Sequence, residues 1–124
     1  MLIEDQLPQI IADFLVEHSE VQPLDHRIVK KFTSLAKNPL PEAHIYDPTI
    51  FRWNFGDGTP IIETSGRTIY HIYEHPGKYT VRHQACNFCA CSNWDLCFKK
   101  ITVKHEDDDN ENNHEEKSSC PTSY

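Results

Sequence analysis

Four cysteines gather within a short stretch of the chain, and their spacing admits three kinds of chemistry. Cys86, Cys89, Cys91 and Cys97 form a C-x2-C-x-C-x5-C array, and Cys120 follows near the C-terminus. Four thiolates could bind zinc tetrahedrally, although structural zinc sites usually combine two separated pairs. Cys86 and Cys97 could instead face each other across a hairpin and form a disulfide, since each lies opposite its apolar neighbour. All five could also be reduced thiols of a cytosolic protein.

The other residue types that support catalysis or metal binding form no recognisable arrangement. Eight histidines are scattered along the chain, without an H-E-x-x-H or similar pair. His83 falls in an apolar strand pattern, where a neutral imidazole would need a partner and would make stability depend on pH. Asp57 could be one oxygen ligand of Ca²⁺, but its position favours a turn residue whose carboxylate accepts backbone N–H groups. We expect no catalytic residue, no cofactor and no resident metal.

These residues lie on or beside a series of expected β-strands. Phe51, Trp53 and Phe55 alternate with polar residues, which is typical of a half-buried strand, and Gly56–Thr59 then forms a tight turn. A second strand runs over residues 67–73, Pro76-Gly77 turns the chain, and a third strand runs over 79–87. Tyr79 is placed so that its hydroxyl can bond nearby backbone and fix this corner.

The remaining segments give weaker patterns. Residues 60–63 suit a short edge strand, because proline is confined to strand starts and edges. Residues 96–103 predict a last strand, with a bulge between Phe98 and Ile101 because their apolar spacing is odd. Residues 5–18 have a helical apolar face, and residues 27–36 suit either a helix or a strand.

Size and charge limit the class of protein. The chain has 124 residues and a net charge of −7, and seven acids against two lysines in residues 104–124 give −5 of it. The nearly neutral remainder offers no basic stripe for nucleic acid. The chain has neither an apolar run of membrane-spanning length nor the pattern of a signal peptide. We expect one domain over residues 1–103 and a disordered acidic tail over 104–124.

Two stretches together resemble the PKD (polycystic kidney disease) domain, whose marks are W-D-F-G-D-G-T followed by H-x-Y-x-x-P-G-x-Y-x-V. The sequence departs from this pattern at Asn54, where the family usually has Asp. The residues that carry the resemblance are Trp53, Phe55, Gly56, Asp57, Gly58, Thr59, His71, Tyr73, Pro76, Gly77, Tyr79 and Val81.

The resemblance implies an all-β fold, an immunoglobulin-like sandwich of about seven strands with its motif core over residues 46–103. Residues 3–45 would then supply strands, and they are similar to the branch of the family that contains the melanosomal matrix glycoprotein and the nmb glycoprotein. The family is extracytoplasmic, which favours disulfides over zinc or free thiols.

The resemblance also implies a function. It predicts a non-catalytic domain on the extracellular or lumenal side, part of a larger membrane or secreted glycoprotein, that contacts proteins or glycans. The alternatives are an intracellular or viral assembly module with the same fold, and a small zinc-stabilised domain.

Overall fold

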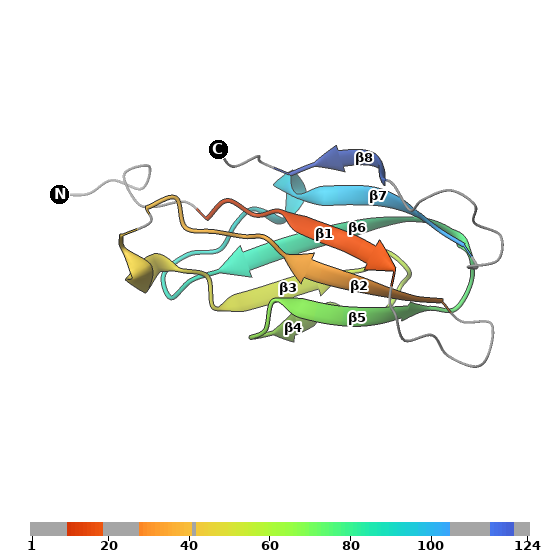
Figure 1. Ribbon diagram of the computed structural model, residues 1–124, viewed down its shortest axis with the longest axis horizontal. Coiled ribbons are helices and arrows are strands. Elements are labelled where there is room, and N and C mark those ends of the chain that lie inside the picture. Colours follow the sequence, from red (N-terminus) through yellow and green to blue (C-terminus); the bar gives the residue numbers. More distant parts are fainter. Residues whose placement is uncertain (1–9, 19–27, 41, 105–114, 121–124) are drawn as a thin grey trace.

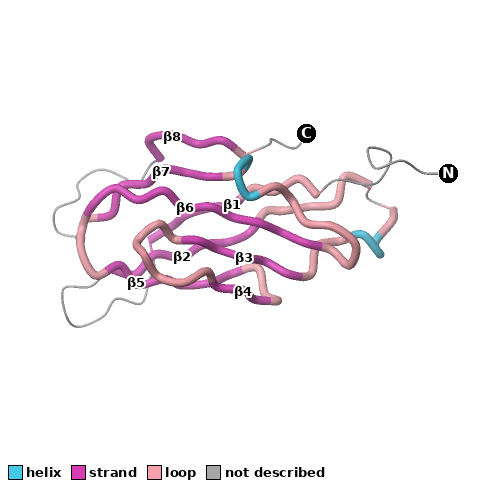
Figure 2. The backbone as a smooth tube through the Cα atoms, turned by 180° about the vertical axis from the view of Figure 1, so that it is seen from behind, coloured by secondary structure: helices cyan, strands magenta, loops and turns pink. Residues whose placement is uncertain are grey.

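The chain folds into two antiparallel β-sheets packed face to face, as Figure 1 shows. The computed structural model describes residues 10–18, 28–40, 42–104 and 115–120. One sheet has the order β1-β2-β5 and the other the order β4-β3-β6-β7-β8 (Figure 2). The strands of the first are β1 (Phe14–His18), β2 (Ile28–Ser34) and β5 (Thr68–Tyr73). Those of the second are β3 (Ile50–Asn54), β4 (Ile62–Thr64), β6 (Gly77–Cys86), β7 (Phe98–Val103) and β8 (Glu115–Ser119).

The prediction of an all-β sandwich of about seven strands is confirmed, because β1–β7 form three- and four-stranded layers and β8 extends the second layer. Trp53 on β3 lies at its centre and is fully buried. Alternation on each strand turns one face inward, so the two apolar faces meet and exclude water. The main cluster of buried residues is Ala12, Phe14, Ile28, Phe32, Trp53, Phe55, Tyr73, Val81, Cys97, Ile101 and Val103.

The N-terminal part consists of strands in its described residues, and the helical alternative is wrong there. Phe14 is buried whereas its neighbour Leu15 is exposed, which is the period of a strand rather than of a helix. β1 and β2 pair in regular register from Phe14 opposite Ser34 onward. Pairing with β5 then holds β2 in the centre of its sheet. Tertiary contacts have overridden a local pattern that suits a helix.

The C-terminal part differs in detail from expectation. A register shift does fall between Phe98 and Ile101, at Lys100/Ile101, but it belongs to the β7–β8 pairing, whereas the β6–β7 pairing is regular. The inward position between the two apolar residues is taken by Lys99, whose ammonium lies 5.4 Å from the Phe14 ring centroid. The disordered tail is also wrong for residues 115–119, which form β8 against β7.

Two short 3-10 helices lie in the connections among the described residues. They are η2 (His44–Tyr46) before β3 and η3 (Trp94–Leu96) before β7. Among the described residues, no helix is long and apolar enough to cross a bilayer.

Candidate functional site

The turn after β3 is built from glycines and from two side chains that accept backbone N–H groups. Gly56 and Gly58 both have positive φ, at 81° and 88°. A Cβ on Gly56 would collide with the Thr80 carbonyl, whereas one on Gly58 would meet open space. Asn54 Oδ1 accepts the N–H of Gly56 at 3.1 Å. Asn54 therefore performs a turn role at the position where the sequence departs from the PKD pattern.

Asp57 is held on both carboxylate oxygens. Its Oδ1 accepts the Thr59 hydroxyl at 2.6 Å and the Thr59 N–H at 3.3 Å, and its Oδ2 accepts His71 Nε2–H at 2.8 Å. Burial alone would raise the pKa of Asp57, but the hydrogen bonds from Thr59 and His71 outweigh it and hold the pKa below its usual value. Both carboxylate oxygens of Asp57 are thus engaged within this corner of the fold. The described residues bring no group of three or more His, Cys, Asp or Glu side chains together.

The residues of the second PKD-like stretch lock the same corner. His71 stacks on Phe55 with ring centroids 4.0 Å apart. The Tyr73 hydroxyl donates to the Phe55 carbonyl at 3.0 Å, and burial raises the pKa of Tyr73 above its usual range. After the Pro76-Gly77 turn, the Tyr79 hydroxyl donates to the His75 carbonyl at 2.7 Å. These side chains are engaged in structure, and none presents a free nucleophile beside a base.

His83 joins the two sheets through the core. It is fully buried on β6, where its Nδ1–H donates to the Arg52 carbonyl at 2.9 Å and its Nε2 accepts the Ser34 hydroxyl at 2.7 Å. Ser34 lies on β2 and Arg52 on β3, so the imidazole bridges the layers. The Trp53 ring stacks on it with centroids 3.9 Å apart. Burial lowers the pKa of His83 to about 4, so the ring is neutral at physiological pH.

The cysteines pair differently from the expected Cys86–Cys97 bond. The disulfides are Cys86–Cys91 and Cys97–Cys120, and Cys89 is free and exposed. Cys86 cannot face Cys97 because the β6–β7 register ends with Arg82 opposite Phe98, well before Cys86. The chain instead folds back at residues 87–90, which sets Cys91 across from Cys86.

The zinc alternative is not compatible with this arrangement. Cys86, Cys91 and Cys97 are all in disulfides, so a set of four thiolates with Cys89 does not exist. Cys97 pairs with Cys120, which ties β8 to the start of β7. The tail cysteine, which the sequence left without a firm partner, is therefore part of the sandwich.

Two connections of the chain lie at one end of the sandwich, on the left in Figure 1. We call residues 42–49 together with the hairpin 86–91 the tip. Ile45 is 68% exposed and Phe88 66% exposed. Phe88 stacks on Tyr46 at 5.6 Å, and the Asn87 side-chain amide donates to the Tyr46 carbonyl at 3.1 Å. The two segments of the tip are thus fixed against each other.

Further hydrogen bonds hold each segment of the tip individually. The Asn38 side-chain amide donates to the carbonyls of Leu40 and Ala43 at 2.9 and 2.8 Å. Asn87 Oδ1 accepts the N–H groups of Cys89 and Ala90 at 2.9 and 2.8 Å. These asparagines replace secondary structure with side-chain bonds, so the loops keep one conformation.

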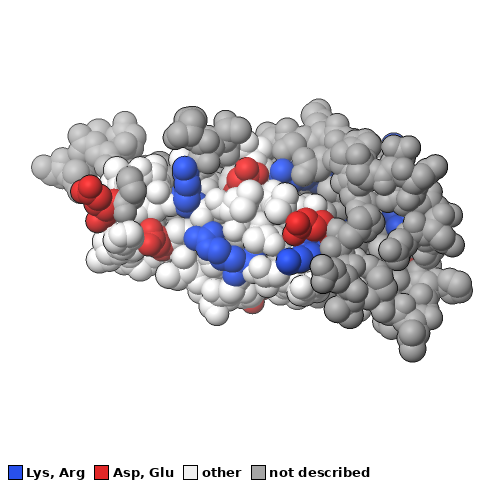
Figure 3. Space-filling view, viewed as in Figure 1, with Lys and Arg blue, Asp and Glu red and all other residues white. Residues whose placement is uncertain are grey.

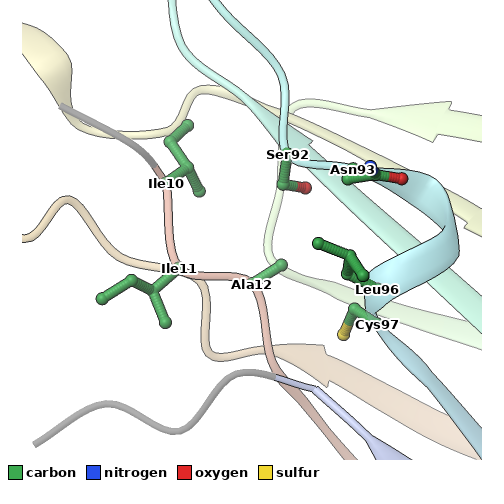
Figure 4. A pocket seen from close by; sticks show the side chains of 7 residues that line it. All are labelled: Ile10, Ile11, Ala12, Ser92, Asn93, Leu96 and Cys97. Atoms are coloured by element: carbon green, nitrogen blue, oxygen red, sulfur yellow. The ribbon is translucent and has the colours of Figure 1, made fainter. Parts of the chain in front are cut away.

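An apolar pocket of about 250 Å³ lies next to the tip. Figure 4 shows Ile10 and Ala12, ahead of β1, facing Ser92 and Leu96 across it. Its remaining lining residues are Ile11, Asn93 and Cys97. On the face of the molecule shown in Figure 3, basic and acidic side chains are interspersed among uncharged ones.

The two PKD-like stretches meet at one end of the two-layer sandwich, where His71 bonds to Asp57 and Tyr73 bonds to Phe55. Residues 40–93 match the PKD domain family. The PKD match covers a little under half of the chain, and it includes the aromatic strand, both turns and the hairpin of the tip. PKD domains are non-catalytic modules, and the match identifies no catalytic domain. Comparison with curated proteins and with solved structures finds no match.

The sequence predicts the turn after β3 and the Tyr79 corner, but it does not predict the tip. Ile45 and Phe88 lie outside any periodic pattern, and nothing in the sequence indicates that two segments about forty residues apart meet. The best available signal was the pair of asparagines, Asn38 and Asn87, because each precedes a short loop in which its side chain can bond the backbone. The cross-sheet partner of His83, Ser34, had no sequence signal.

Proposed function

We propose that this chain is a non-catalytic recognition domain of the extracellular or lumenal side, and that its tip binds a protein partner. The observation that carries the proposal is the exposure of Ile45 and Phe88 on loops that hydrogen bonds and a disulfide hold in place. Contacts made by loops on a rigid scaffold are a common basis of recognition.

Binding is favoured when the side chains that make the contact are already ordered in the free protein. A flexible loop loses conformational entropy when it binds, and a side chain that is already fixed loses less. Phe88 is stacked on Tyr46 before any partner arrives. Large apolar side chains in this state are the kind that dominate protein interfaces. Apolar side chains favour a protein surface over a glycan, which needs more hydrogen-bonding groups, so glycan binding is the second candidate.

The two disulfides support the location. They form and persist in oxidising compartments and are rare in the cytosol. Freshly isolated protein, denatured for the measurement, should therefore show one reactive thiol before reduction and five after it. Five reactive thiols in freshly isolated protein would count against an extracellular or lumenal site and in favour of an intracellular or viral assembly module.

We further propose that the chain is part of a larger membrane or secreted glycoprotein. The resemblance of residues 3–45 to the melanosomal and nmb glycoprotein branch supports this. The sequence of the full-length gene tests it, through an upstream signal peptide and a downstream membrane span.

The binding proposal is tested by presenting the purified chain to panels of recombinant extracellular protein domains and of immobilised glycans. For each ligand found, the affinity of the double variant I45S/F88S is compared with that of wild type. Loss of two central apolar contacts should weaken a tip ligand by about tenfold or more.

I61S is the matched control. Ile61 is also exposed, at 52%, but it precedes β4 and lies away from the tip. Protein ligands that bind I61S like wild type and I45S/F88S much more weakly support the proposal. Equal binding by all three chains would show that the tip is not the contact, and a glycan ligand sensitive to I45S/F88S would favour the second candidate.

A further inference from the structure

Three cysteines lie in the hairpin at the end of β6, and Arg52 of the neighbouring strand β3 lies beside two of them. Cys86 and Cys91 are joined, and Cys89 is an exposed free thiol in the turn between them. The Arg52 Nη1 lies 3.7 Å from Cys86 Sγ and 3.8 Å from Cys91 Sγ. A nucleophile, an electrophilic disulfide and a cation beside both sulfurs therefore occur within six residues and one neighbouring strand.

We propose that this hairpin is a thiol–disulfide exchange site, in which Cys89 attacks the Cys86–Cys91 disulfide. The Cys89 thiol gives its proton to water, and the thiolate attacks Cys86 Sγ. The Cys86–Cys89 bond forms, the Cys86–Cys91 bond breaks, and Cys91 leaves as a thiolate that takes up a proton from water. One disulfide and one thiol are present before and after, so no external oxidant or reductant is required.

Reach along the chain permits this attack. A single residue separates Cys89 from Cys91, so their Cα atoms are at most about 7 Å apart. Cys86 and Cys91 are themselves 4.0 Å apart at Cα. The backbone bond from Asn87 N–H to the Ala90 carbonyl, at 2.9 Å, closes the turn that contains Cys89.

The spacing decides which isomer forms. A Cys86–Cys89 bond has the Cys-x-x-Cys spacing of exchange-active disulfides. A Cys89–Cys91 bond would have to close across a single residue, which ordinary disulfide geometry disfavours. Attack on Cys86, with Cys91 leaving, is therefore the productive direction. Cys91 is also exposed, so the released thiol meets solvent.

Arg52 supports the departure of Cys91. A guanidinium beside a sulfur stabilises the thiolate, and a better leaving thiolate speeds exchange. The arginine is held in place by hydrogen bonds from its Nε to Glu63 Oε1 at 2.8 Å and from its Nη1 to Gln84 Oε1 at 2.9 Å. Glu63 offsets part of its charge from the side away from the sulfurs.

The exchange would also alter the tip. Asn87 and Phe88 would lie inside the new Cys86–Cys89 ring, and both now contact Tyr46. The isomer would therefore change the contacts that fix the two segments of the tip. The exchange chemistry does not depend on the recognition function proposed above. It is tested by the position of the free thiol, which can be determined without any binding partner.

The test is to map the free thiol with time. Oxidised wild-type protein is held at acid pH, brought to mildly alkaline pH without reductant, and trapped at intervals with a fast maleimide before peptide mass spectrometry. Label should appear on Cys91 as well as Cys89, with Cys86, Cys97 and Cys120 unlabelled. Label confined to Cys89 after prolonged incubation would overturn the proposal.

Variants separate the parts of the mechanism. In C89S the Cys91 label should be absent. In R52Q its rate of appearance should fall about three- to tenfold, because loss of the guanidinium disfavours the Cys91 thiolate and a less acidic thiol leaves more slowly. R82Q is the matched control, because Arg82 lies over the Phe98 ring instead, and it should exchange like wild type. An R52Q rate equal to that of R82Q would remove Arg52 from the mechanism.

Protein concentration distinguishes exchange within one chain from exchange between chains. A rate of Cys91 labelling that is unchanged on tenfold dilution supports the proposed attack. A rate that falls in proportion would assign the exchange to two copies and would overturn it.

Discussion

A single imidazole carries much of the polar specificity of this core. His83 satisfies both of its ring nitrogens on other strands, through the Arg52 carbonyl and the Ser34 hydroxyl. A buried polar group costs free energy unless it is fully hydrogen-bonded, and a fully bonded one fixes the relative position of the elements it joins. In this sandwich it fixes β2 against β3 and β6, next to the buried Trp53.

The burial of His83 predicts that stability falls with acidity. Its folded pKa is about 4, below the ordinary value of 6.5, so between these values the unfolded chain binds a proton that the folded chain does not. The free energy of unfolding should therefore decrease as pH falls from about 7 to about 4, by about 3 kcal/mol in all. Urea unfolding at a series of pH values measures this.

The variant H83Q provides the control for that measurement. Glutamine can donate to the Arg52 carbonyl and accept from Ser34, but it does not titrate. H83Q should be less stable than wild type near neutral pH, and the difference should narrow by about 3 kcal/mol toward pH 4. Protonation of Asp57 lowers stability only at a more acidic pH than that of His83, because the pKa of Asp57 is held below 3.8. Parallel pH curves for the two chains would contradict the assignment.

The turn after β3 depends on two glycines for different reasons. Both adopt positive φ, but Gly56 packs against the Thr80 backbone whereas Gly58 faces open space. G58A should cost about 1–2 kcal/mol, the price of a left-handed conformation with a Cβ. G56A should cost about 1 kcal/mol or more beyond that, because backbone must move to admit the methyl group. Thermal unfolding of the two variants measures the difference in stability. Equal losses of stability would show that the Thr80 backbone moves aside at little cost.

Elements with strong local signals could be predicted from the sequence. The strand of Phe51, Trp53 and Phe55 has a period of two, and its turn has glycines where positive φ is needed. β1 was ambiguous because Phe14 and Leu15 suit a helical face equally well. β8 was missed because its residues, Glu115–Ser119, are polar and their only stabilising signals are the β7 partner and Cys120, both set by tertiary structure.

The candidate sites divide in the same way. The turn after β3 could be predicted because its bonds are local, as from Asp57 to Thr59, whereas the bond from His71 to Asp57 joins two separate stretches and could not. The cysteine pairing could not, because it depends on where the β6–β7 register ends, and one register shift changes which residues face each other. The tip requires the meeting of Tyr46 and Phe88 from separate connections, which no local pattern encodes.

At the scale of the whole molecule, the chain closes its second sheet with a covalent bond. β8 is polar and pairs with β7 alone, so the Cys97–Cys120 disulfide holds it against the sandwich. A disulfide of 23-residue separation stabilises the folded chain by about 3 kcal/mol, chiefly by restricting the unfolded chain.

The variant C120S should therefore lose about that much stability and should lose amide protection in β8 and in the β7 N–H groups that face it. Guanidinium unfolding and hydrogen exchange measure the two effects. The double variant C89S/C91S is the appropriate comparison, because it opens a loop of 5-residue separation whose closure is worth only about 2 kcal/mol and leaves Cys86 no partner in this hairpin. It should leave exchange in β8 unchanged. If C120S kept full amide protection in β8, backbone pairing with β7 would be sufficient to hold the strand, and the disulfide would not be required for it.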